Sequence, residues 1–205
     1  KLRKISGVNN INAEEILPRK ILDKYTKNNK YGFIASFSDE FRIHLMKAQK
    51  GWWFDMDIIC LKSSENFNLL EQDKRIVAGY EEGNNIANGV LKINDQLIVS
   101  EILNKMEKAD AKPIRGAIGP KLIKQIVENN NLTNEILVQK FFFPINYTNF
   151  HWLFMPNKKK EVQSLYGESY LCHFYNEILK RFSYTRNILP PEGSFLYEKI
   201  IEFDP

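Results

Sequence analysis

The chain has 205 residues, of which 43% are hydrophobic and 13% aromatic, so it can bury the core of one globular domain. Its net charge of +4 is too small and too scattered to indicate nucleic-acid binding, although mild basicity suits an anionic substrate. The two cysteines do not suggest a disulfide framework, which favours a reducing compartment.

No stretch of the sequence has the pattern of a membrane span or a signal peptide. We therefore expect a location in the cytoplasm or on the cytoplasmic face of a membrane. The densest basic run is Lys158-Lys159-Lys160. It is the candidate for peripheral contact with a membrane surface, although most such runs are solvated loops.

Hydrophobic periodicity predicts alternating helices and strands, and so an α/β fold. A helix is expected to begin at the capping residues Ser38 and Asp39 and to end before Gly51. The aromatic run from Trp52 to Leu61 then predicts one buried strand, with Cys60 as a small core residue. The other predicted elements are a helix over 13–25, a polar loop over 62–74, strands over 75–80 and 86–93, a helix capped by Asn94 or Asp95, a linker over 109–119, a helix opened by Gly119-Pro120, a strand over 136–143, and helices over 177–183 and 195–201.

Two aspartates, Asp55 and Asp57, interrupt this predicted strand. A buried carboxylate is costly unless it is paired, hydrogen-bonded or bound to a metal. Residues i and i+2 of a strand point to the same face, so the two carboxylates would repel each other unless a cation lay beside them. Oxygen ligands favour Mg²⁺ or Mn²⁺, which commonly also hold phosphate oxygens. A strand end at which both carboxylates reach water explains the same pattern, and D-x-D spacing alone is common by chance.

The residues around these aspartates resemble the DXD-motif sugar transferases. The residues that carry the resemblance are Phe37, Ser38, Asp39, Arg42, Leu45, Gly51, Trp53, Asp55 and Asp57. That family includes capsular-polysaccharide, α-mannosyl and α-N-acetylglucosaminyl transferases and, more distantly, the large clostridial glucosylating toxins. Lys50 departs from the pattern, because the family usually has the first glycine of a pair there.

The resemblance implies one GT-A-like α/β domain over residues 1–205, with a central mixed sheet flanked by helices and the site at the carboxyl ends of the strands. Family members usually begin with a strand-turn-helix unit that holds the nucleotide base. Ile16-Leu17-Pro18 resembles a segment that lies shortly before the Ser-Asp-x-x-Arg helix. We therefore expect the N-terminal unit to be missing or short and the domain to be truncated at its N-terminus.

The resemblance also implies roles for individual residues, with Asp55, Asp57 and Arg42 as the candidate catalytic residues. Asp57 would bind Mn²⁺ (or Mg²⁺) directly, and Asp55 would hold ribose, the sugar or the metal. Asp39 would accept hydrogen bonds from the donor sugar, and Arg42 would donate to its hydroxyls or phosphates. A structural Asp–Arg pair on a helix is the alternative for these two residues. Trp53 would stack on the donor, although packing in the core is the commoner fate of such a ring.

Two weaker motifs add Asn88 and His173. Asn88-Gly89 stands where the family commonly has an Asn-Gly or Asn-Ala pair, so Asn88 would bond a donor hydroxyl; a turn explains the pair equally well. The segment from Tyr170 to Asn176 resembles a C-terminal motif whose histidine completes the metal shell or touches the diphosphate. His173 is therefore a candidate metal ligand, with a hydrogen-bonded core histidine as the alternative.

We therefore predict a metal-dependent, retaining transfer of a sugar from a nucleotide sugar, UDP-linked in preference to GDP-linked. The acceptor would be a glycan, a lipid-linked glycan or a protein, in polysaccharide, capsule or surface-glycan biosynthesis. Two alternatives stay open: a catalytically silent module that binds sugar nucleotides or glycans, and a metal-dependent phosphohydrolase that uses the same aspartates.

Overall fold

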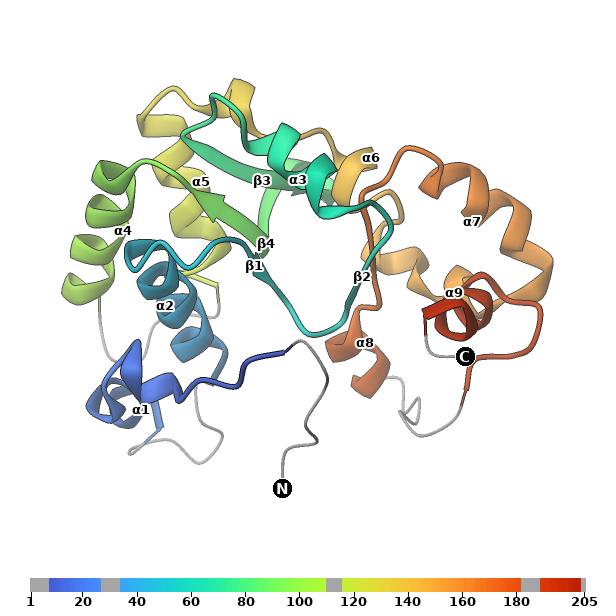
Figure 1. Ribbon diagram of the computed structural model, residues 1–205, viewed down its shortest axis with the longest axis horizontal. Coiled ribbons are helices and arrows are strands. Elements are labelled where there is room, and N and C mark those ends of the chain that lie inside the picture. The colour runs from blue at the N-terminus through green and yellow to red at the C-terminus, as the bar shows by residue number, and fades with distance from the viewer. Residues whose placement is uncertain (1–7, 27–33, 110–115, 182–188, 204–205) are drawn as a thin grey trace.

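The computed structural model describes residues 8–26, 34–109, 116–181 and 189–203 (Figure 1). In chain order the elements are the 3-10 helix η1 (Ala13–Glu15), α1 (Arg19–Thr26), α2 (Ile34–Lys47), β1 (Trp53–Phe54), β2 (Ile58–Cys60), α3 (Ser64–Glu71), β3 (Ile76–Glu81), η2 (Glu82–Asn84), β4 (Asn85–Ile93), α4 (Gln96–Lys108), α5 (Pro120–Asn129), η3 (Thr133–Glu135), α6 (Gln139–Phe142), η4 (Tyr147–Phe154), η5 (Pro156–Lys158), α7 (Lys159–Tyr166), β5 (Leu171–His173), α8 (Asn176–Arg181) and α9 (Phe195–Phe203). None of the helices in these ranges is long and apolar enough to cross a membrane.

The strands form two small sheets flanked by helices, which confirms the predicted α/β class. One sheet has the order β1-β4-β3, the other pairs β2 with β5, and all of these pairs are antiparallel. Consecutive strands joined by a tight connection such as η2 can only pair in this direction. Within the described ranges, the one parallel pairing is the isolated bridge between Gly79 and Leu137, so the sheet is less mixed than expected.

Strands β3 and β4 form the centre of the fold because helices cover both of their faces. Ile76 and Ala78 of β3 point into a core shared with α2, α4 and α5, whereas Val77 between them points to the opposite face. Figure 1 shows α2 and α4 to the left of these two strands. Burial on both faces explains why the two strands are nearly uninterrupted apolar runs.

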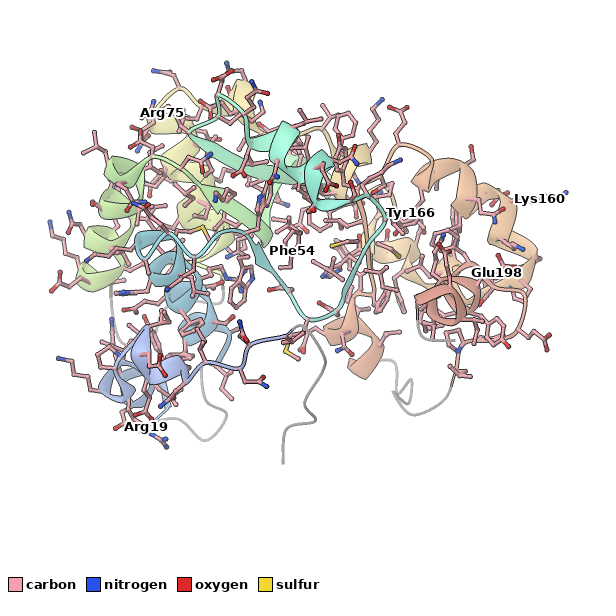
Figure 2. The ribbon with its side chains drawn as sticks, viewed as in Figure 1. Arg19, Phe54, Arg75, Lys160, Tyr166 and Glu198 are labelled. Carbon is pink, nitrogen blue, oxygen red and sulfur yellow. The ribbon has the colours of Figure 1, made fainter. Side chains whose placement is uncertain are left out.

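A separate apolar cluster holds the C-terminal part together. Its buried members are Ile145, Leu153, Val162, Tyr166, Cys172, Phe195 and Leu196. Apart from Ile145, which precedes η4, they come from η4, α7, β5 and α9. Helices α7 and α9 lie on the right of Figure 1. Figure 2 shows Phe54 near the middle of the molecule, whereas the charged side chains of Arg19, Arg75 and Lys160 project from its periphery. The strands β2 and β5 lie between the two parts and join them.

The prediction of one buried strand from Trp52 to Leu61 is wrong. The run divides into β1, which pairs with β4, and β2, which pairs with β5. A turn containing Asp55, Met56 and Asp57 separates them, and Met56 is fully exposed. Cys60 is also exposed rather than in the core. The turn avoids the cost of burying two carboxylates in an apolar strand.

The helix predicted to begin at Ser38 begins four residues earlier, at Ile34. Ser38 and Asp39 therefore do not cap it; their side chains accept hydrogen bonds from Arg42 and Asn88 instead. The C-terminal end of the helix agrees with the prediction, because the helix ends at Lys47 and Gly51 follows with φ of 94°. Asn88, which is distant in the sequence, donates to the Asp39 carboxylate that the local pattern had assigned to capping the helix.

Two further predictions are wrong. The polar loop over 62–74 contains α3, which buries Phe67, and the strand over 136–143 is mainly the short helix α6. After one bridge at Leu137 the chain coils, and Phe142 packs on Gly79 so closely that a Cβ there would lie 2.9 Å from Phe142 Cδ2. The linker over 109–119 and the end of the helix over 177–183 lie partly outside the described residues.

The other predicted elements are confirmed. The helical stripe over 13–25 restarts at Pro18 as η1 and α1, and the two central strands, the helix capped by Asp95, the helix opened by Gly119-Pro120 and the last helix are present. These segments combine a clear apolar period with a local start signal, so the neighbouring sequence was enough to define them.

Candidate active site

Asp55, Asp57 and His173 converge at the junction of the two sheets. Asp55 follows β1, Asp57 precedes β2, and His173 ends β5, whose first pairing with β2 joins Ile58 to His173. One ligand atom from each of the three side chains lies within 4.8 Å of the other two. The two carboxylates therefore share a site as the spacing suggested, although a turn and not a strand brings them together.

Asp57 is fixed at both of its carboxylate oxygens. Its Oδ2 accepts from the backbone N–H of Asn176 at 2.8 Å, and its Oδ1 lies 3.4 Å from His173 Nε2. Burial alone would raise the pKa of Asp57, but the imidazole of His173 and the Asn176 N–H outweigh it and hold that pKa below its usual value. The carboxylate of Asp57 is thus favoured as an anion with a defined orientation.

Asp55 faces the opposite side of the same site. Its Oδ1 accepts from Trp53 Nε1 at 2.7 Å and lies 3.6 Å from Arg42 Nη2. Its backbone N–H donates to the carbonyl of Gly89 at 2.8 Å. A Cβ on Gly89 would lie 2.8 Å from Asp55 Oδ2, so glycine permits the close approach of β4 to this carboxylate.

Arg42 is the buried centre of a polar network and is only 5% exposed. Its Nε and Nη2 donate to the carbonyl and the hydroxyl of Ser38, and its Nη1 donates to the carbonyl of Asn88. The guanidinium also lies 4.9 Å from the centre of the Trp53 ring. Most donors of Arg42 are thus engaged within the protein, which favours a role in positioning the site.

Asp39 belongs to the same network and is 7% exposed. Its Oδ1 accepts from Asn88 Nδ2 at 2.8 Å and lies 3.6 Å from Arg42 Nη2. Burial raises the pKa of Asp39, and nearby Asp55 adds to this, whereas Arg42 and Asn88 oppose it. The Gly119 that opens α5 packs directly on Asp39, because a Cβ there would lie 2.3 Å from Oδ2.

Trp53 packs against the core with Phe41, at 6.2 Å between ring centres. Its ring also contacts Arg42 and its N–H is used by Asp55. The structure therefore unites all the predicted site residues in one network: Asp39, Arg42, Trp53, Asp55, Asp57, Asn88 and His173. Contact with a donor stays a prediction for each of them.

A cavity of about 260 Å³ opens beside this network. Asp55, Asn88 and His173 line it, together with residues to which the sequence analysis gave no role, among them Glu81 and Tyr147. Burial raises the pKa of Glu81, partly offset by nearby His173. The one signal that pointed to Glu81 was the paired Glu81-Glu82 at the end of an apolar strand.

The donor set of Asp55, Asp57 and His173 fits a divalent ion. Ligands about 2.1 Å from a six-coordinate ion lie about 3 Å from their neighbours and about 4.2 Å from the opposite ligand, close to the spacing found. Two carboxylates and an imidazole suit Mn²⁺ and, less well, Mg²⁺. The Tyr175 N–H lies 3.2 Å from His173 Nδ1. That contact would have to lengthen if Nε2 bound an ion, since the ring proton would then lie on Nδ1.

Comparison with known proteins gives one match. The sequence model of a family described as the alpha 1,4-glycosyltransferase conserved region matches residues 94–200, just over half of the chain. The matched part runs from α4 into α9 and contains His173, whereas both aspartates precede it. No curated protein and no solved structure matches the chain. The chain belongs to the alpha-1,4-glycosyltransferase family, and sugar transfer is the activity that this membership supports.

Proposed function

We propose that the protein is a divalent-metal-dependent transferase that moves a sugar from a nucleotide-sugar donor to a glycan acceptor. The observation that carries the proposal is the convergence of Asp55, Asp57 and His173 beside a cavity in a chain of a glycosyltransferase family. His173 lies more than a hundred positions after the two aspartates in the sequence. Folding has brought together a set of groups with the charge and donor atoms for a metal–diphosphate complex.

The residues of the site would have separate roles in this reaction. Asp55, Asp57 and His173 would hold Mn²⁺ or Mg²⁺, which supplies positive charge where negative charge develops on the departing diphosphate. Arg42 fixes Asp39, Asn88 and Asp55 through its contacts, so it would keep the sugar-binding groups in register. Asn88 and Asp39 are hydrogen-bonded to each other, and each would have lone pairs or N–H groups left for donor hydroxyls.

Retention of anomeric configuration, a UDP-linked donor and a role in polysaccharide or surface-glycan synthesis complete the proposal. They are supported by the resemblance of the segment from Phe37 to Asp57 to the DXD-motif transferases. A peripheral membrane contact has weaker support, because Lys158 and Lys159 form ion pairs with Glu161 and Glu198. Those pairs reduce the charge that the lysine run offers to a lipid surface.

The test is thermal unfolding against a panel of UDP- and GDP-sugars, with and without Mn²⁺. A ligand at 100 times its Kd stabilises a protein by about 2.7 kcal/mol, which is readily seen as a rise in Tm. We expect a rise that needs both Mn²⁺ and one nucleotide sugar. Sugar transfer, or hydrolysis of that donor in the absence of an acceptor, should follow.

Other outcomes separate the alternatives. A rise in Tm without transfer or donor hydrolysis would identify a silent binding module. Release of inorganic phosphate without an acceptor would identify a phosphohydrolase. No rise with any donor would contradict the proposal.

A further inference from the structure

The residues that line the cavity beside the metal-binding candidates fall into two groups. One group belongs to the polar network already described and contains Asp55, Asn88 and Gly89. The other group contains Glu81 from the end of β3 and Tyr147 from the start of η4, to which that network gives no role. His173 lies among the residues that line the cavity as well. Sugar transfer joins two reactants, so the site needs groups for an acceptor besides those proposed for the donor.

Among the described residues, no hydrogen bond or ion pair engages the carboxylate of Glu81, although the group is half-buried, lines the cavity and lies near His173. A half-buried carboxylate loses hydration, so it gains from hydroxyl donors that reach it. Sugar hydroxyls are such donors, and a carboxylate can accept from two neighbouring hydroxyls at once.

Tyr147 supplies the second element of a sugar site. Its side chain is 51% exposed, whereas most large hydrophobic side chains around it are buried. An aromatic ring with one apolar face open to a cavity can cover the C–H face of a pyranose, while the phenol keeps contact with water. A carboxylate and an exposed ring that line the same small cavity thus match the hydroxyl groups and the C–H face of a single sugar.

The charge of the lining restricts which sugar can enter. Glu81 and Asp55 both line the cavity. Glu82 follows Glu81, and one of its carboxylate oxygens is buried and has no hydrogen-bond partner among the described residues. Like charges repel at short range, so an acidic sugar would be disfavoured beside these carboxylates.

We propose that Glu81 and Tyr147 form the subsite for the terminal sugar of the acceptor, and that this sugar is a neutral pyranose and not a uronic or sialic acid. Glu81 accepts hydrogen bonds from its hydroxyls and Tyr147 packs on its ring. The assignment to the acceptor rests on the proposed transferase function. The existence of a sugar subsite does not, because it follows from Glu81 and Tyr147 as lining residues of the cavity.

The first experiment measures binding and does not require transfer. Ligand-observed NMR with Mn-free Mg²⁺ and UDP present would compare methyl glycosides of neutral hexoses with the matching methyl hexuronides. We expect binding of at least one neutral glycoside and none of its hexuronide. Binding should weaken about 10- to 100-fold in Glu81→Gln and about 5- to 10-fold in Tyr147→Ala, while Tyr147→Phe keeps it.

The second experiment uses the donor that the thermal panel identifies. Glu81→Gln should raise the acceptor KM and lower transfer about 10- to 100-fold, and this loss should exceed any loss of donor hydrolysis to water by about tenfold or more. The matched control is Glu202→Gln in α9, which makes the same chemical change outside the lining of this cavity and should alter neither rate.

The outcomes distinguish the two proposals. Equal binding of hexosides and hexuronides, or unchanged binding in both Glu81→Gln and Tyr147→Ala, would overturn the subsite even if donor hydrolysis is intact. Glycoside binding that depends on Glu81 in a protein without donor-dependent activity would overturn the transferase function and the acceptor assignment, leaving a glycan-binding site.

Discussion

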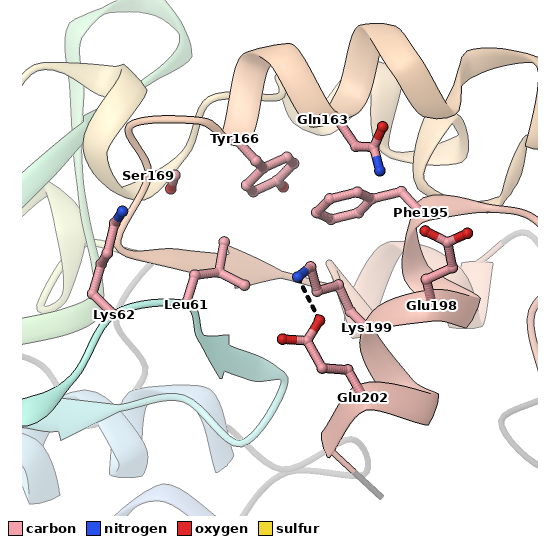
Figure 3. A pocket seen from close by; sticks show the side chains of 9 residues that line it. All are labelled: Leu61, Lys62, Gln163, Tyr166, Ser169, Phe195, Glu198, Lys199 and Glu202. Atoms are coloured by element: carbon pink, nitrogen blue, oxygen red, sulfur yellow. Dashed lines mark hydrogen bonds and ion pairs between the residues drawn. The ribbon is translucent and has the colours of Figure 1, made fainter. Parts of the chain in front are cut away.

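Two cavities of nearly the same size differ in what their charged groups do. The cavity at the candidate site measures about 260 Å³, and one between β2 and α9 measures about 270 Å³ (Figure 3). In the second, Lys199 forms an ion pair with Glu202 at 2.6 Å, and Tyr166 stacks on Phe195 at 4.9 Å between ring centres. The Lys199 and Glu202 charges are therefore paired with each other, and the rings of Tyr166 and Phe195 pack on each other.

Within the part of the chain that the structure describes, the acidic groups around the site cavity do not have enough cations to neutralise them in this way. Asp55 and Asp57 lie near each other and near His173, and Glu81 has no hydrogen-bond or ion-pair partner among the described residues. The buried arginine, Arg42, lies behind Asp55 and engages mainly backbone and hydroxyl groups. Acidic groups gathered without enough cations indicate a ligand that brings positive charge or hydroxyl donors. The volumes alone would not show which of the two cavities is the candidate active site.

The largest expected effect comes from Asp57→Asn. Exchange of the carboxylate for an amide keeps the shape but removes a charged oxygen from the metal-binding set, so metal-dependent transfer should fall by about 10³-fold. The measurement is initial transfer rate as a function of Mn²⁺ concentration. Activity within tenfold of the wild type would remove Asp57 from metal binding.

The next effect comes from Arg42→Lys. Lysine cannot reproduce the fork that contacts Ser38 and Asn88, and the acceptors left without donors are buried. We expect a loss of about 1–3 kcal/mol in the free energy of unfolding, together with weaker donor binding. Urea denaturation and the donor titration measure the two effects. A fall in donor affinity with unchanged stability would instead favour direct contact of Arg42 with the donor.

A smaller and more local effect is expected from Gly119→Ala. The added Cβ would lie 2.3 Å from Asp39 Oδ2, so the carboxylate or the start of α5 must move. We expect donor affinity to fall about tenfold if Asp39 contacts the donor sugar, as a lost charged hydrogen bond would produce. Gly167→Ala is the matched control, because Gly167 has helical angles and a Cβ there would make only ordinary contacts, the nearest at 3.4 Å from the Ser164 carbonyl oxygen, so alanine should leave affinity unchanged.

The smallest effect is expected in the second cavity. Lys199→Met breaks the ion pair with Glu202, whose side chain is 55% exposed, so the free energy of unfolding should change by at most about 1 kcal/mol. Transfer activity should not change. A loss of activity comparable to that of Arg42→Lys would show that the second cavity takes part in the reaction. It would contradict the distinction drawn between the two cavities.

The sequence alone determined the elements with a strong local signal. Central strands β3 and β4, the Asp95-capped α4 and the Pro-opened α5 follow from apolar period and start residues that act within a few positions. The sequence also singled out Asp55 and Asp57, because two carboxylates in an apolar run require a chemical explanation.

Only the tertiary structure decided how the candidate residues meet. The division of the 52–61 run depended on pairing with β4 and β5, more than thirty and more than a hundred residues away. The approach of His173 to Asp57 depends on the same long-range pairing of β2 with β5. Local spacing determines which side chains can share one face of a helix or strand. Pairing between distant strands determines which charged groups lie together, because burial is a property of the whole fold.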